Sequence, residues 1–336
     1  MTEAERKRQA ALEAAGGGPL VVSTPENVRW LLCGRGRPVD VGSADYAVVL
    51  TDDSAQVVFA DIEQSRVDDE ERLGELGYEL APYRWYERPE ALTDTEVDLA
   101  PLRRTLCPEE VDRYRATGAD AAAGLAEAIA RLDSAQTENE AAGELARSTR
   151  ARDLVARVNL VGGEQRQPVH RHPLPTSAPL GRHALLAVTL ERDGLHVSMT
   201  RIVSFGRPPE RLQELVQASA EVDAAVIAAS KPGRTHGELL DVIAEAYDRE
   251  GFPEEWRRHH QGGLTGYKGR EVFAVPGEPT PVPPVGVVAW NPSITGGGKS
   301  EDTVLVTAEG PEVLTRTPEL GELDTRGFPR PAIVEL

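Results

Sequence analysis

The 336-residue chain is poor in several features that would point to particular classes of protein. Its two cysteines, Cys33 and Cys107, are spaced for neither a disulfide framework nor a zinc knuckle. No stretch approaches the roughly 18 consecutive apolar residues of a membrane span, and the chain's start lacks the apolar run of a signal peptide. Lysine is scarce, which we interpret as a signature of a high-GC or salt-adapted host. These absences predict a reduced, cytoplasmic location.

Basic residues are also in deficit. Lys and Arg number 37 against 55 Asp and Glu, so the formal charge is −18. A field of that sign repels phosphate backbones and anionic lipids, and we therefore expect neither a nucleic-acid nor a membrane partner. With 27% charged and 40% hydrophobic residues, the composition is typical of one large globular domain or two modest ones.

The first hundred residues are rich in strand-like patterns. Apolar runs occupy residues 28–32, 46–50 and 56–60. The turn at 51–54 between the last two predicts a hairpin. Between residues 81 and 105 the periodicity fails and three prolines occur, which is typical of a linker, so we place a domain boundary near Pro101. We therefore expect a small α/β domain over residues 1–101 and a larger domain over 102–336.

The larger domain is predicted to combine helices with antiparallel strands. Pro108 followed by two glutamates is typical of the first turn of a helix. Thr137 with Glu140 forms a capping box that begins a second helix. Further helices are expected at 208–230 and 235–250, and strands at 184–191, 195–205, 271–275, 285–290, 303–307 and 312–315. The first two of these strands flank a turn and predict a long hairpin. The fold class is therefore α+β.

Histidines and glycines are the informative residues, because the common phosphate, dinucleotide, serine-hydrolase and zincin motifs are absent. His170 and His172 form one pair, and His259 and His260 form another. Histidine accepts or donates a proton near neutral pH, since its unperturbed pKa is about 6.5. The glycine-rich segment 262–266 indicates that backbone approaches a ligand or another chain closely. The alternatives are exposed polar loops and a plain turn between helix and strand.

The order of short motifs resembles the creatinase and aminopeptidase P superfamily, whose pita-bread fold is shared with methionine aminopeptidase and prolidase. The matching segments are residues 27–31 (NVRWL), 108–110 (PEE), 137–140 (TENE), 170–173 (HRHP), 198–201 (SMTR), 259–266 (HHQGGLTG) and 301–307 (EDTVLVT). They cover nearly the whole chain, and their order and spacing agree with the family. The resemblance predicts a pita-bread domain preceded by a smaller α/β domain.

The family's peptidases hold two divalent metals with two aspartates, one histidine and two glutamates, and the metal pair generates hydroxide for attack on the peptide. The resemblance places these five ligands on Ala187, Ser198, Gly263, Asn291 and Glu301. Only the last of these is a carboxylate, and neutral side chains do not supply the charge that offsets dehydration of the metal. The resemblance therefore implies a member without a dinuclear metal site and without a cofactor.

Other site positions are retained. The resemblance places the family's proton-shuttling histidine on His170 and a histidine that lines the substrate pocket on His259. Creatinase, a metal-free branch of the family, uses the first of these for acid and base work. His172 and His260 are expected to be solvent-facing neighbours. The expected substrate-binding residues are Arg201, Gly263, Arg270, Asn291 and Glu301, of which the arginines would bind a carboxylate and the glutamate a cation.

Three functions follow from the resemblance. The first is a metal-independent hydrolase or lyase that acts on a C–N bond of a small amino-acid-like or guanidino compound, with His170 as general base. The second is a catalytically silent protein that binds a ligand or a protein partner. The third is an Xaa-Pro aminopeptidase or dipeptidase with an atypical metal site. By analogy with creatinase-like dimers we expect a homodimer in which Arg35 or Arg37 completes the partner's pocket.

Overall fold

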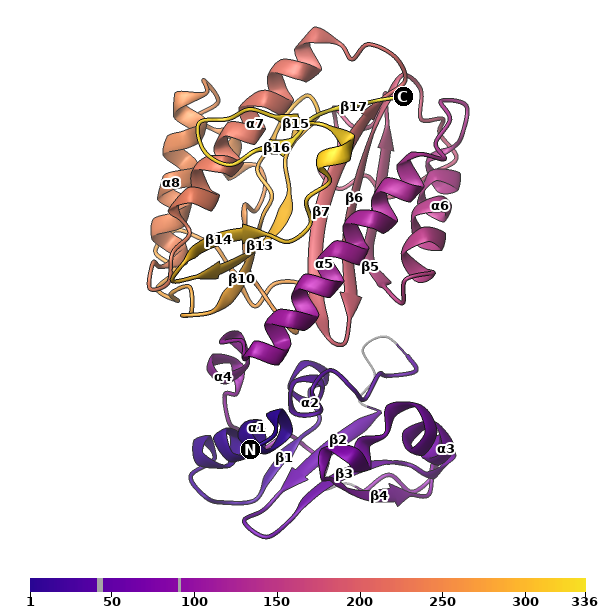
Figure 1. The fold of residues 1–336 in the computed structure, drawn as a ribbon, viewed down its shortest axis with the longest axis vertical. Coiled ribbons are helices and arrows are strands. Elements are labelled where there is room, and N and C mark those ends of the chain that lie inside the picture. Colours follow the sequence, from indigo (N-terminus) through magenta and orange to yellow (C-terminus); the bar gives the residue numbers. More distant parts are fainter. Residues whose placement is uncertain (41–44, 90–91) are drawn as a thin grey trace. The chain divides into compact units, whose positions relative to one another are not determined.

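The computed structural model describes residues 1–40, 45–89 and 92–336. These residues form two compact units, the first with residues 1–109 and 193–195 and the second with residues 110–192 and 196–336 (Figure 1). The boundary expected near Pro101 stays a prediction. In the described parts of the chain, no helix combines the length and the apolar character needed to cross a membrane.

The first unit contains one four-stranded sheet. Its strands are β1 (Leu20–Val22), β2 (Tyr46–Leu50), β3 (Ala55–Ala60) and β4 (Glu79–Tyr83), in that order across the sheet. Pairs β1–β2 and β2–β3 are antiparallel and β3–β4 is parallel, and β2–β3 confirms the predicted hairpin. The helices are α1 (Glu3–Ala14), α2 (Pro25–Leu31), α3 (Gln64–Arg66) and α4 (Ala100–Arg104), with short helical turns at Asp61–Glu63, Val67–Glu71 and Leu73–Leu76.

The prediction of a strand at residues 28–32 is wrong, because this apolar run forms the end of helix α2 and its C-cap. Pro25 lies in the first turn, where its fixed φ suits a helix and its missing N–H costs no bond. Glu26 in the first turn and Arg29 in the last complement the helix dipole. The helix buries Trp30. A short apolar run does not by itself distinguish a buried helix from a buried strand.

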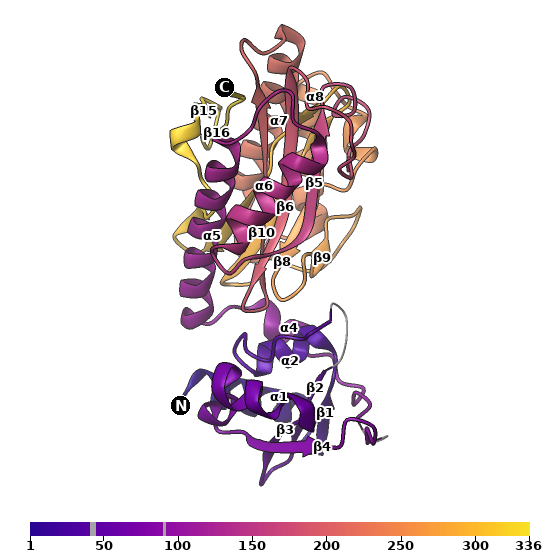
Figure 2. The same cartoon turned by 90° about the vertical axis from the view of Figure 1, so that its right-hand side faces the viewer.

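The second unit has four long helices, all near the predicted positions. They are α5 (Pro108–Ile129), α6 (Glu138–Arg150), α7 (Glu210–Ala229) and α8 (His236–Arg249). The predicted capping box is confirmed: Thr137 accepts from the backbone of Glu140, and the Glu140 side chain accepts from the backbone of Thr137. Helices α7 and α8 lie side by side. Helix α5 crosses the unit diagonally in Figure 1 and runs along its edge in Figure 2.

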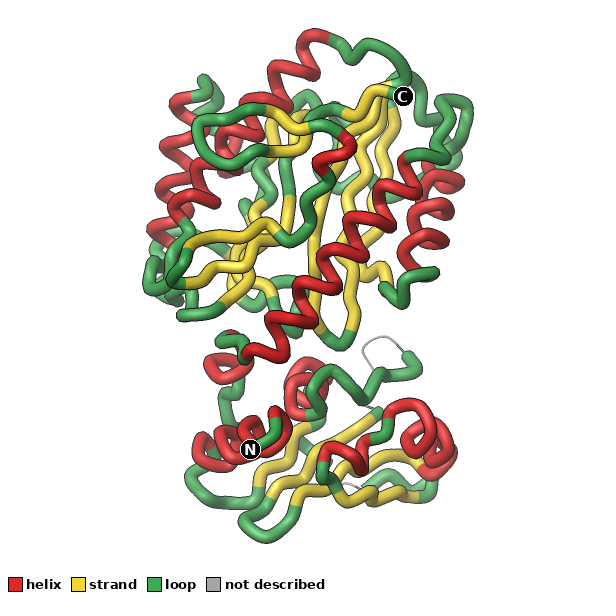
Figure 3. Tube along the Cα trace, in the orientation of Figure 1, coloured by secondary structure: helices red, strands yellow, loops and turns green. Residues whose placement is uncertain are grey.

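Two sheets lie between these helices (Figure 3). The first has the order β17-β7-β6-β5, with β5 (Val155–Gly163), β6 (His183–Arg192), β7 (Leu195–Ser204) and β17 (Val334–Glu335). The second has the order β14-β13-β10-β8-β9, with β8 (Gly262–Thr265), β9 (Val272–Phe273), β10 (Gly286–Trp290), β13 (Asp302–Thr307) and β14 (Gly310–Val313). Two-stranded ribbons pair β11 (Ser293–Ile294) with β12 (Gly298–Lys299) and β15 (Glu322–Leu323) with β16 (Arg330–Pro331). The predicted β6–β7 hairpin is confirmed, whereas β5 and β8 are additional strands.

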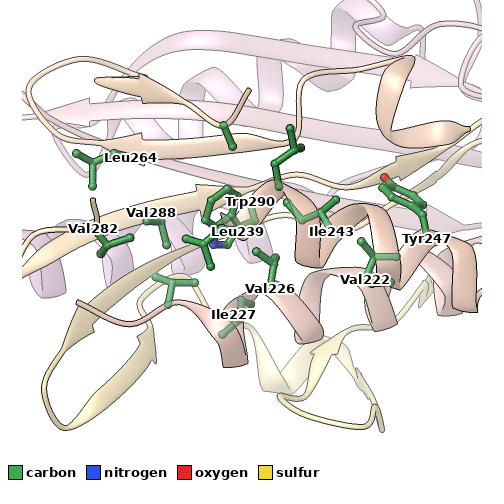
Figure 4. Close-up of a cluster of buried hydrophobic side chains, with 14 of the residues drawn as sticks. Val222, Val226, Ile227, Leu239, Ile243, Tyr247, Leu264, Val282, Val288 and Trp290 are labelled. Atoms are coloured by element: carbon green, nitrogen blue, oxygen red, sulfur yellow. The ribbon is translucent and has the colours of Figure 1, made fainter. Parts of the chain in front are cut away.

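The main core of the second unit packs helices α7 and α8 against the second sheet (Figure 4). Its labelled side chains are Val222, Val226, Ile227, Leu239, Ile243, Tyr247, Leu264, Val282, Val288 and Trp290. Full burial of each aliphatic side chain contributes about 1.5–3 kcal/mol. The Trp290 indole N–H donates to Ser230 Oγ at 3.0 Å, so the polar edge of the ring is also satisfied. The core therefore fixes the end of β10, after which Asn291 follows.

Buried charges join the two sheets. Asp302 accepts from Arg201 at 3.0 Å and from Arg330 at 2.7 Å. An isolated β-bridge next to this network pairs Thr200 of the first sheet with Glu301, the residue that precedes β13 of the second. Buried charges are tolerated only when they are paired and hydrogen-bonded, so this network fixes the junction tightly.

Candidate functional site

Glu301 lies at the junction of the two sheets and is only 5% exposed. Its Oε2 accepts a hydrogen bond from the Thr200 hydroxyl at 2.6 Å and lies 3.2 Å from Lys299 Nζ. Its Oε1 lies 3.4 Å from Arg270 Nη2. One carboxylate is thus shared by two buried cations, and the trio Lys299, Glu301 and Arg270 carries one net positive charge.

The electrostatics of this trio follow from burial and pairing. Burial raises the pKa of Glu301, but the positive charges of Lys299 and Arg270 and the Thr200 hydroxyl outweigh it, so the pKa is lowered overall. Burial lowers the pKa of the Arg270 guanidinium, and Glu301 opposes that effect. Arg270 Nη1 also lies 3.3 Å from Ser198 Oγ. The guanidinium of Arg270 therefore links the hydroxyl of Ser198 in β7 to the carboxylate of Glu301.

Two of the expected binding residues carry a buried polar atom with no hydrogen-bond partner in the described parts of the chain. These atoms are Asn291 Oδ1 and Arg270 Nε. Asn291 is 2% exposed, and its backbone N–H donates to the Gln261 carbonyl at 3.1 Å. An unpartnered buried donor or acceptor costs free energy. A small polar ligand that bonds to either atom would recover part of that cost.

Three histidines from two loops form a cluster that the sequence did not predict. His172 lies between β5 and β6, and His259 and His260 lie just before β8. One ring nitrogen from each histidine lies within 4.8 Å of those of the other two, and His172 Nε2 is only 3.0 Å from His259 Nε2. The rings of His259 and His260 stack with centroids 4.4 Å apart. His172 and His260 are exposed, as expected, but both are also direct neighbours of His259.

The environment of the cluster favours neutral imidazoles. Burial lowers the pKa of His172 and of His259, and the charge of Lys299 lowers both further. Burial, with the charge of Arg270, lowers the pKa of His260 to about 4. At neutral pH each of the three rings therefore keeps one unprotonated nitrogen.

His170 lies outside this cluster. Its side chain is exposed and lines a surface hollow together with Gln167, Ser293 and Lys299. Leu185 supplies an apolar side chain to the same hollow. His170 therefore lines the same hollow as Lys299, which is one of the two cations paired with Glu301.

The expectation that Arg201 binds an anion is wrong. Its side chain is 1% exposed, and its guanidinium donates to Thr317 Oγ1, to Asp302 and to the carbonyls of Thr200 and Thr315. These partners belong to the junction of the two sheets. Arg201 therefore stabilises that junction and is not available to a ligand.

The glycine-rich segment 262–266 is strand β8 with the first residue of the following turn. Gly262 and Gly263 have φ of 100° and 145°, which side-chain-bearing residues rarely adopt. A Cβ at Gly263 would lie 2.1 Å from the carbonyl oxygen of Val272, and one at Gly262 would lie 2.0 Å from that of Ala289. The close approach that the glycines indicate is to the neighbouring strands β9 and β10.

Residues 112–308 match the sequence model of metallopeptidase family M24. Because the match covers more than half of the chain, the chain belongs to metallopeptidase family M24. The superfamily and the pita-bread fold that the short motifs predicted are confirmed.

Known proteins of this kind resemble the chain at low identity. An uncharacterized peptidase of Staphylococcus aureus is 22% identical over 230 residues, which are 66% of this chain and 65% of the relative, slightly less than two thirds of its length. The dipeptidase PepE from Mycobacterium ulcerans has a TM-score of 0.75 at 19% identity, covering 99% of this chain and 98% of its own. The prolidase from Pyrococcus horikoshii has a TM-score of 0.74 at 16% identity, covering 94% and 99%. These two structures establish the fold.

The residues at the positions expected for the family's metal ligands do not fit a pair of divalent cations. Among the five, Glu301 is the one carboxylate, and its oxygens already face Lys299 and Arg270. The Ser198 hydroxyl is bonded within the site, and Ala187 packs in an apolar cluster. Two dications beside two buried cations would be strongly repelled and poorly ligated. No reaction step is therefore assigned to a metal pair.

Proposed function

We propose that this M24 protein is a metal-independent hydrolase or lyase that acts on a C–N bond of a small amino-acid-like or guanidino compound. The observation that carries the proposal is the buried carboxylate of Glu301 bonded to both Lys299 and Arg270. A buried site with one net positive charge favours a ligand that carries a carboxylate. Glu301 is proposed to pair with an ammonium or guanidinium group of the same ligand when Lys299 or Arg270 turns from Glu301 to the ligand's carboxylate.

His170 is proposed as the general base, because it is exposed on the hollow that Lys299 also lines. In a hydrolysis, His170 would take a proton from water while the water oxygen bonds to carbon. The C–N bond then breaks, and His170 returns the proton to the leaving nitrogen. His259 is proposed to line the substrate pocket, with Asn291 as a polar contact.

The test is turnover by EDTA-treated protein of a panel of guanidino acids and N-substituted amino acids, with products identified by mass spectrometry. We expect turnover to survive the chelator and to fall at least ~100-fold in His170→Ala. The matched control is Gln165→Ala, an exposed residue of the same loop that should keep the wild-type rate. Activity that needs added metal, or that is unchanged in His170→Ala, would overturn the proposal.

A second candidate function is Xaa-Pro peptidase activity with an atypical metal site. It is favoured by the structural neighbours, which include a dipeptidase and a prolidase. It predicts two equivalents of manganese, cobalt or zinc per chain by elemental analysis and metal-dependent cleavage of Xaa-Pro dipeptides. Metal-free protein that still processes a guanidino acid would exclude it.

A third candidate is a catalytically silent protein that binds a ligand or a protein partner through the same site. It predicts a ligand-induced rise in melting temperature without any product. The expected homodimer, completed by Arg35 or Arg37, also stays a prediction. In the first unit Arg35 Nη1 donates to the Arg72 carbonyl at 2.8 Å. Sedimentation equilibrium of the wild type and of Arg35→Ala tests the dimer directly.

A further inference from the structure

The histidine cluster has the chemistry and spacing of a metal site that differs from the family's five-ligand position. His172, His259 and His260 each offer one ring nitrogen, and these atoms lie within 4.8 Å of one another. In a tetrahedral site with metal–nitrogen bonds of about 2.0–2.1 Å, two ligand nitrogens lie roughly 3.3 Å apart. The 3.0 Å separation between His172 Nε2 and His259 Nε2 is close to that value. The ligand nitrogen of His260 lies within 4.8 Å of the other two, so its exposed ring would have to rotate to complete the site.

A neighbouring hydroxyl orients the central histidine. His259 Nδ1 lies 3.4 Å from Ser293 Oγ, on the side of the ring opposite to Nε2. If Nδ1–H donates to this hydroxyl, the Nε2 atom of His259 carries its lone pair on the side that faces His172 Nε2. Ligating histidines commonly use their second nitrogen in this way. The Ser293 hydroxyl is itself held by Arg171 Nη1 at 2.6 Å, so the contact is built into the fold.

Packing also orients the third histidine. The ring of His260 meets the ring of Phe273 edge to face, with centroids 5.2 Å apart, and stacks on His259. His172 is followed by the buried Pro173, which restricts the loop that carries it. Two loops separated by 87 residues are therefore held so that three imidazoles converge.

Charges near the cluster decide which ligand completes such a site. Arg171 is ion-paired with Glu255, while Lys299 and Arg270 share Glu301. One positive charge therefore remains unmatched beside the cluster. It weakens the attraction for a dication and favours an anionic group at any open coordination position.

We propose that His172, His259 and His260 bind one divalent transition-metal ion of the zinc, cobalt, nickel or copper class, with a fourth position open to water or an anion. Three imidazoles suit these borderline cations and do not suit magnesium or calcium, which prefer oxygen ligands. The proposal does not rest on the proposed reaction, which assigns no step to a metal.

The test is titration of untagged, EDTA-treated, full-length protein with zinc chloride, followed by calorimetry. We expect one equivalent per chain, with binding weakened at least ~10-fold in His172→Ala and in His260→Ala. Cobalt chloride should give visible absorption bands of tetrahedral intensity that zinc displaces. The matched control is His170→Ala, which removes an exposed histidine two residues from His172 and should bind one equivalent as the wild type does.

Circular dichroism and urea midpoints equal to wild type will show that the variants are folded, since His172 and His260 are exposed. Wild-type protein that binds no zinc, or variants that bind it as tightly as wild type, would overturn the proposal. Two equivalents that persist in both variants would also overturn it and would favour the peptidase candidate. Failure of the proposed reaction is measured separately, by turnover in metal-free protein.

Discussion

Arg270 Nη2 lies 3.4 Å from Glu301 Oε1, with both side chains almost completely buried. This contact places a guanidinium beside the one acid among the five positions to which the motif resemblance assigns the family's metal ligands. A buried ion is expensive unless it is paired, so Glu301 and its two cations are mutually dependent. The pairing with Lys299 and Arg270 supplies the opposite charge that a buried carboxylate needs.

Glu301→Gln is expected to lower the free energy of unfolding by roughly 3–5 kcal/mol, because Lys299 and Arg270 would be left without their shared counter-ion. Urea denaturation followed by circular dichroism measures the change. The control is Glu312→Gln, which breaks an exposed pair with Arg115 at 2.8 Å and should cost about 0–1 kcal/mol. Equal losses in the two variants would mean that the Glu301 trio is not a coupled buried unit.

Asp223 should make stability depend on pH in the acid range. Burial raises its pKa from 3.8 to about 6, against the lowering effect of Arg330 and Ser300. Between these two values the native state holds a proton that the unfolded chain has released, so the free energy of unfolding falls as pH rises. The penalty is absent below about pH 4 and complete above about pH 6.

Asp223→Asn removes this titration. The difference in unfolding free energy, wild type minus variant, should decrease by roughly 2–2.5 kcal/mol between pH 4 and pH 7. Urea titrations at each pH measure it, and subtraction cancels the contributions of all other groups. Asp241→Asn, an exposed aspartate of α8, is the control and should give a flat difference. A difference that rises with pH for Asp223→Asn would show the opposite sign of shift.

The sequence predicted the long helices because their ends carry local signals. The capping box of Thr137 and Glu140 begins α6 where expected, and the proline at 108 begins α5. Strand β8 gave no such signal, since Gly262 and Gly263 have low strand propensity and are held by the neighbouring strands. The prediction of a strand at residues 28–32 was wrong for a related reason. The helical conformation of this run depends on Pro25 and on burial in the first unit.

The site was predictable only in part. The motif resemblance pointed to Glu301, Arg270 and His259, but it assigned Arg201 to a ligand that the buried network excludes. The contact between His172 and His259 joins loops 87 residues apart, and one sequence does not tell which loops meet. The available signal was the local density of histidine, with His172 two residues from His170 and His260 next to His259.

Gly263→Ala tests whether the strand packing itself prevents a side chain at the position to which the motif resemblance assigns the family's metal histidine. Its backbone φ of 145° is strained for any side chain, at a cost of roughly 1–3 kcal/mol, and the new Cβ would lie 2.1 Å from the Val272 oxygen. Overpacking of this kind adds about 1–3 kcal/mol, so we expect a total loss of roughly 2–6 kcal/mol in urea denaturation.

The control for this prediction is Gly251→Ala, where φ is 84° and no atom lies within 4 Å of the added Cβ. It carries the backbone strain without the clash and should cost about 1–2 kcal/mol. If Gly263→Ala costs no more than this control, β8 and β9 can separate easily, and a histidine at 263 would be tolerated. If the larger loss is found, a metal-ligating histidine could return at this position only after β9 moves away from β8. In that case the absence of this ligand is a property of the strand packing and not of a single replaced side chain.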